Sequence, residues 1–91
     1  MVSNLFRDEE TMPTVLRIGA YRFYFYSHEP NEPAHIHIDK DNFTAKLWLH
    51  DVSIAHNISF ANYELRELQR LVTENRIRLQ EAWNAYFNKR E

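Results

Sequence analysis

The residues best suited to chemistry are two histidines, His35 and His37, in the run Pro33-Ala34-His35-Ile36-His37-Ile38. Histidine titrates near neutral pH without help, and it is also a good metal ligand. Side chains two residues apart on a β-strand point to the same face of a sheet. If this run is a strand, the two imidazoles therefore lie side by side, and Ile36 and Ile38 point to the opposite face.

Three interpretations of the histidine pair stay open at this point. As general base and general acid, the pair could cleave a phosphodiester, with Arg22 or Lys46 stabilising the charged phosphorane. As metal ligands, the two histidines need at least a third donor. The candidates for that donor are His28, His50, Glu32 and Asp51. In the third interpretation, the imidazoles fill a half-buried strand face and hydrogen-bond to nearby tyrosines.

Amphipathic aromatic residues and two cations share this part of the sequence. The aromatic residues are Tyr24, Tyr26 and Trp48. Each combines a flat apolar ring with a polar group, so they could stack on bases, anchor a protein partner, or form a small core under a loop. Arg22 and Lys46 could bind phosphate, or they could form cross-strand ion pairs with a carboxylate such as that of Glu32.

Alternating polar and apolar residues predict the strands that position these groups. The predicted strands are 14–18, 21–26, 35–39 and 43–49, with turns at 19–20 and 40–42. Pro30 and Pro33 block ladder hydrogen bonds, so 28–33 is expected to be a loop. The sequence thus predicts a small antiparallel sheet of about four or five strands in an α+β fold.

The same alternation predicts two different sheet faces. The apolar face collects Tyr21, Phe23, Phe25, Ile36, Ile38, Phe43, Ala45, Leu47 and Leu49. The other face collects Arg22, Tyr24, Tyr26, His35, His37, Thr44, Lys46, Trp48 and His50. A face that mixes cations, imidazoles and amphipathic rings is typical of a recognition or reaction surface.

Helical periodicity follows from residue 60 to residue 88. Ser59 is predicted to be the N-cap, with a hydrophobic staple between Ile58 and Tyr63. One unbroken helix over this range would be about 43 Å long, which exceeds the size of so small a domain. We therefore expect two helices, with a break between Thr73 and Arg76, that cover the apolar face.

Length and composition limit the domain organisation and the classes of protein to which the chain can belong. The chain has 91 residues, of which 44% are apolar, and a formal net charge of -2. We expect an N-terminal arm over 1–11 and a single domain over 12–91. The absence of cysteine excludes disulfides and a thiol nucleophile, and the charge does not favour nonspecific nucleic-acid binding. Without a signal peptide or a long apolar run, the expected location is the cytoplasm.

Several segments carry a resemblance to a known family. They are Met12-Pro13-Thr14, 21–26, Glu32-Pro33-Ala34-His35-Ile36-His37, 45–49 and the helical stretch from Glu64 to Trp83. Over residues 12 to about 88 the chain resembles the bacterial family named domain of unknown function 4160. The resemblance implies the toxin-like half of a type II toxin–antitoxin module, usually paired with a protein of the domain of unknown function 2442 family. The chain departs from the family at its N-terminal extension and at 50–56.

The expected function is therefore that of a toxin neutralised by a cognate antitoxin. In its enzymatic form the protein is a metal-independent ribonuclease without a cofactor, and His35 and His37 are the catalytic residues. Arg22 and Lys46 bind the phosphate, and an aromatic clamp holds the nucleotide. That clamp consists of Tyr24, Tyr26 and Trp48. The alternative is a non-enzymatic module that binds protein or nucleic acid, or a regulatory subunit that acts in a complex. The expected partners are the antitoxin, RNA and, through an exposed edge strand, a second copy of the chain; no membrane partner is expected.

Overall fold

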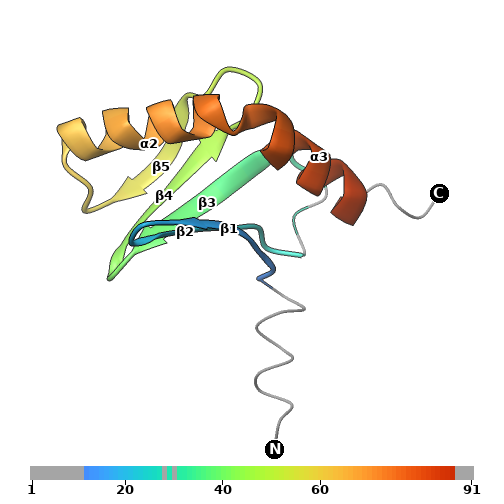
Figure 1. Ribbon diagram of the computed structural model, residues 1–91, viewed down its shortest axis with the longest axis horizontal. Coiled ribbons are helices and arrows are strands. Elements are labelled where there is room, and N and C mark those ends of the chain that lie inside the picture. Colours follow the sequence, from blue (N-terminus) through green and yellow to red (C-terminus); the bar gives the residue numbers. More distant parts are fainter. Residues whose placement is uncertain (1–11, 28, 30, 88–91) are drawn as a thin grey trace, which may run out of the picture.

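The computed structural model describes residues 12–27, 29 and 31–87 and shows one sheet with two helices (Figure 1). The strands are β1 (Thr14–Ile18), β2 (Tyr21–Tyr24), β3 (His35–Lys40), β4 (Phe43–Trp48) and β5 (Ile54–Ile58), and the helices are α2 (Asn62–Glu74) and α3 (Arg76–Phe87). The five strands pair antiparallel in sequence order. The predicted α+β fold is therefore confirmed. The predicted N-terminal arm over 1–11 lies outside the described residues.

The core lies between the sheet and the two helices. On the sheet side it comes from residues of the predicted apolar face, in the strands and directly after them. The buried ones are Phe23, Phe25, Ile36, Ile38, Ala45, Leu47 and Leu49. The helices add Leu68, Leu71, Val72, Leu79 and Trp83. Each large apolar side chain that is fully buried contributes about 1.5–3 kcal/mol. The alternation of the strands and the helical period thus place these side chains in one shared core, and neither α2 nor α3 packs along the second sheet face.

The predicted break between the helices is confirmed at Asn75. The backbone N–H of Asn75 donates to the carbonyls of Leu71 and Val72, and its side-chain amide also donates to Leu71. Its φ of -112° and ψ of 16° depart from helical values, so the axis changes direction there. Because of this change, α3 runs beyond the end of the sheet and brings Trp83 to the start of β3 (Figure 1).

The predicted start of the helical region was wrong. The helix begins at Asn62 after Ala61, and Ser59 adopts a positive φ of 79° instead of capping it. The predicted staple is also absent, since Ile58 is 48% and Tyr63 is 70% exposed. The chain is held here by Asn57, whose side-chain Oδ1 accepts from the N–H of Phe60 and whose Nδ2 donates to its carbonyl.

Asn57→Ala is expected to lower the free energy of unfolding by about 1–2 kcal/mol, because it removes both hydrogen bonds that hold the backbone of buried Phe60. Urea unfolding measures the change. Asn84→Ala is the matched control, since Asn84 is exposed on α3, and it should change stability by less than about 0.5 kcal/mol. Equal losses in the two variants would contradict the bracing role of Asn57.

No helix within the described residues is long and apolar enough to cross a membrane.

Candidate functional site

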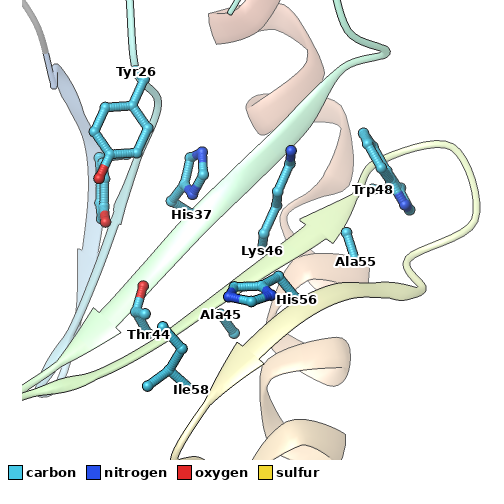
Figure 2. A pocket seen from close by; sticks show the side chains of 10 residues that line it. Tyr26, His37, Thr44, Ala45, Lys46, Trp48, Ala55, His56 and Ile58 are labelled. Atoms are coloured by element: carbon cyan, nitrogen blue, oxygen red, sulfur yellow. The ribbon is translucent and has the colours of Figure 1, made fainter.

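The face of the sheet opposite the helices carries a row of side chains that crosses four strands. In the strand register Tyr24 pairs with His37, His37 with Lys46, and Lys46 with His56. Directly paired residues project to the same face, so these four groups stand side by side. Figure 2 shows His37, Lys46 and His56 in front of the sheet, with the helices behind it. We call this surface the open face.

The open face is hollowed to a volume of about 480 Å³. The lining residues are Tyr24, Tyr26, His37, Thr44, Ala45, Lys46, Trp48, Ala55, His56 and Ile58 (Figure 2). Tyr24, Tyr26, His37, Lys46 and Trp48 are residues that the sequence singled out, and the fold brings them together. Arg22 and His35 do not line the hollow.

His35 and His37 leave the same side of β3, as the strand period requires. Their ring centroids lie 5.1 Å apart, and both rings contact one carboxylate oxygen. Oε1 of Glu29 is 2.7 Å from Nε2 of His35 and 2.9 Å from Nε2 of His37. The other ring nitrogen of His35, Nδ1, donates to the carbonyl of Pro33 at 2.8 Å, because a carbonyl can only accept. The pair is thus joined by a third residue.

The two histidines differ in access to solvent. His35 is fully buried, and its ring packs against Trp83 of α3 at 5.0 Å and Trp48 at 5.7 Å. His37 retains 9% exposure, with its ring stacked on Tyr24 and met edge-on by Tyr26. Only His37 of the pair therefore offers a direct contact to a molecule in the hollow.

Burial and hydrogen bonding set the charge states of these groups. Desolvation by burial lowers the pKa of His37, although the hydrogen bond with Glu29 opposes that shift. For Glu29, burial acts to raise the pKa, but the hydrogen bonds with His37 and His35 outweigh it, so its pKa is lowered. Burial, followed by the hydrogen bond from Tyr24 to Asp39, raises the pKa of Tyr24. At neutral pH, His37 is uncharged, Glu29 is a carboxylate and Tyr24 keeps its proton.

The two cationic side chains predicted to bind phosphate, Lys46 and Arg22, both contact neighbouring residues of the chain. Nζ of Lys46 donates to Oε1 of Glu32 at 2.5 Å and lies 4.9 Å from the ring centroid of Trp48. The ion pair with Glu32 predicted as the alternative is therefore present, although Glu32 lies in the connection between β2 and β3 and not on a strand. The Arg22 guanidinium lies 4.4 Å from the Tyr24 ring centroid and donates to Oγ1 of Thr14 and the carbonyl of Met12.

Glu29 is the site residue that sequence reasoning missed. It lies in the connection between β2 and β3, where no periodicity fixes the direction of a side chain, so its spacing from His35 carried no signal. Of the other predicted donors, Glu32 lies 3.7 Å from Nδ1 of His35. His50 and Asp51 contact each other in the exposed β4–β5 connection, and His28 lies outside the described residues.

His35→Ala is expected to lower the free energy of unfolding by about 2–4 kcal/mol, because it removes a fully buried ring and leaves the Pro33 carbonyl without its donor. Chemical denaturation measures the loss. His50→Ala serves as the matched control, since the His50 side chain is 65% exposed, and it should stay within about 0.5 kcal/mol of wild type. If the two variants were equally stable, His35 would not contribute to the fold as its burial indicates.

The fold and this face define a small α+β protein that carries a polar and aromatic hollow on the sheet face opposite α2 and α3 (Figure 2). The chain belongs to the family described as Domain of unknown function (DUF4160), whose model matches residues 20–84. That range includes Glu29, the histidine pair and the open face up to Ile58. No curated protein and no solved structure matches the chain.

Proposed function

We propose that this chain is the toxin-like half of a toxin–antitoxin pair and that it acts by binding, with the open face as the surface that a protein partner covers. The observation that supports this most is the hollow of about 480 Å³ lined by Tyr24, Tyr26 and Trp48 on a face that neither helix covers. Tyrosine and tryptophan are enriched at protein interfaces because they offer large contact areas with a polar tip.

The charges of the open face favour a protein over a nucleic acid. Lys46 is paired with Glu32, and Arg22 is turned toward β1, so neither presents a free cation to a phosphate backbone. Affinity for nucleic acid depends mainly on such cations. The net charge of -2 also disfavours binding to a nucleic acid, which is itself negatively charged.

An apolar margin extends the surface toward β5. Ile58 lines the hollow and is 48% exposed, and it lies on the strand at the edge of the sheet. An apolar side chain beside aromatic rings adds area that a protein interface can desolvate, and β5, at the edge of the described sheet, offers backbone groups to the same partner.

The test is co-expression of the chain with the protein encoded by the neighbouring gene. We expect growth inhibition by the chain alone, relief by the partner, and a purified complex whose affinity can be measured by calorimetry. Growth inhibition that the neighbouring protein does not relieve, with no complex between the two, would contradict the proposal.

A second candidate is the ribonuclease activity, and one observation favours it. His37 is uncharged at neutral pH and lines the hollow beside Lys46, so it can accept a proton from a bound molecule. The burial of His35 leaves His37 as the group that contacts substrate. In this case His37→Gln should abolish cleavage of RNA and growth inhibition while the protein stays folded. Unchanged inhibition by that variant would exclude the enzymatic candidate.

A further inference from the structure

We infer that Glu29, His35 and His37 form a binding site for a first-row divalent metal ion, of which Zn²⁺ is the representative. One ligand atom from each of the three residues lies within 4.8 Å of the other two, and Oε1 of Glu29 is 2.7 Å and 2.9 Å from Nε2 of His35 and His37. Two imidazoles and one carboxylate are a donor set that holds Zn²⁺ and related ions in proteins. This inference goes beyond the proposed function, and it is an alternative to the use of the same histidines as acid and base.

The hydrogen bonds of His35 orient its ring for ligation. Nδ1 donates to the carbonyl of Pro33 at 2.8 Å, so in the neutral ring Nε2 carries the lone pair. That lone pair faces Oε1 of Glu29 at 2.7 Å, and a carboxylate oxygen is an acceptor as well. Two acceptors at this distance need a proton or a metal ion between them. A histidine whose other ring N–H donates to a backbone carbonyl is the common arrangement of metal-ligating histidines.

The second histidine is held as firmly by its neighbours. The ring of His37 is stacked on Tyr24 at 5.4 Å between centroids and is met edge-on by Tyr26 at 4.7 Å. Both histidines belong to β3, which is paired on both sides. Strand and ring contacts therefore fix the two nitrogen ligands before an ion arrives, which is the preorganisation that metal sites require.

The carboxylate supplies the adjustable ligand and the charge. Metal–ligand bonds of about 2.0–2.2 Å in tetrahedral geometry place the donor atoms about 3.3 Å apart. Oε1 of Glu29 must therefore move away from Nε2 of each histidine by about half an ångström when an ion binds. Glu29 lies in the connection between β2 and β3, outside the ladder hydrogen bonds of the sheet. Its side chain is 20% exposed and that of His37 is 11% exposed, which leaves the site a route to solvent.

The donor set also predicts which ions bind. Imidazole nitrogens favour Zn²⁺, Co²⁺ and Ni²⁺, whereas Mg²⁺ and Ca²⁺ require oxygen ligands almost throughout. Three protein ligands leave at least one position on the ion for water or another ligand, as in zinc sites that are not purely structural.

The test is titration of the full-length protein, after treatment with a chelator, with Zn²⁺ by calorimetry and with Co²⁺ by visible absorption. We expect one equivalent of each ion to bind, no binding of Mg²⁺ at millimolar concentration, and a rise in Tm of about 10–20 °C at a Zn²⁺ concentration one hundredfold above Kd. Glu29→Gln should weaken binding by at least about 100-fold while keeping the size of the side chain. Its fold is checked by circular dichroism.

His50→Gln is the matched control, because His50 is an exposed histidine outside the three ligands, and it should bind Zn²⁺ as wild type does. Failure of the wild-type protein to bind Zn²⁺, or equal binding by Glu29→Gln, would overturn the inference and leave a proton as the link between Glu29 and His35. Partner binding is measured separately, so a failed metal titration does not bear on the protein-binding proposal.

Discussion

Trp83→Ala is expected to lower the free energy of unfolding by about 3–5 kcal/mol, the largest loss that we predict for a single substitution. Trp83 is 6% exposed, and its ring lies 5.4 Å from Phe25, 4.2 Å from Phe87 and 5.0 Å from His35 between centroids. The substitution removes the largest side chain of α3 from the core and uncovers His35 at the same time. Equilibrium unfolding in urea, followed by circular dichroism, measures the loss.

Ile77→Ala is the control for this substitution. Ile77 is on the same helix but 76% exposed, so its removal should change stability by less than about 0.5 kcal/mol. A Trp83→Ala variant as stable as Ile77→Ala would mean that α3 does not pack on the end of the sheet as described, and the burial of His35 would then lose its explanation.

Trp48→Ala is expected to have the largest effect on partner binding, with a loss of affinity of at least about 30-fold, which corresponds to about 2 kcal/mol. The Trp48 ring lines the hollow and contacts Lys46. Its removal deletes the largest amphipathic surface of the open face, whereas most of the core is untouched because Trp48 is not among the core residues. Calorimetric titration with the partner measures the affinity.

Two comparisons make this second prediction specific. Ile77→Ala should bind the partner as wild type does, because Ile77 lies on α3 and is not among the residues of the hollow. The enzymatic candidate predicts a different ranking, in which His37→Gln matters for activity and Trp48→Ala matters less. Wild-type affinity in a folded Trp48→Ala variant would count against the open face as the binding surface.

Much of the fold is predictable because it rests on periodicity. The alternation at 35–39 and 43–49 sorted Ile36, Ile38, Ala45 and Leu47 onto the helix side, and all four are buried. The gap in the apolar repeat near Asn75 marked the helix break, since a polar residue there interrupts the stripe that faces the sheet. These patterns are local in sequence, so they can be interpreted without knowledge of tertiary contacts.

The candidate site was predictable only in part, because two of its features depend on contacts between distant segments. Strand geometry placed His37 and Lys46 on one face, but nothing in the local sequence brings Glu29 from a connecting loop to both histidines. Likewise, the burial of His35 arises from Trp83, 48 positions later in the chain, and from the direction of α3 after Asn75. The error at Ser59 has a similar cause: Asn57 and Phe60 fix the chain before the helix starts.

The most direct test of the protein-binding proposal uses the two tryptophans of the chain as internal reporters. Their indole N–H resonances can be followed by NMR as the neighbouring gene's protein is added, with Trp48→Phe to assign them. We predict that the Trp48 signal shifts markedly at saturation and that the Trp83 signal shifts much less, because Trp83 is 6% exposed and does not line the hollow. A saturated complex in which the Trp48 signal does not move would contradict the open face as the working surface of this protein.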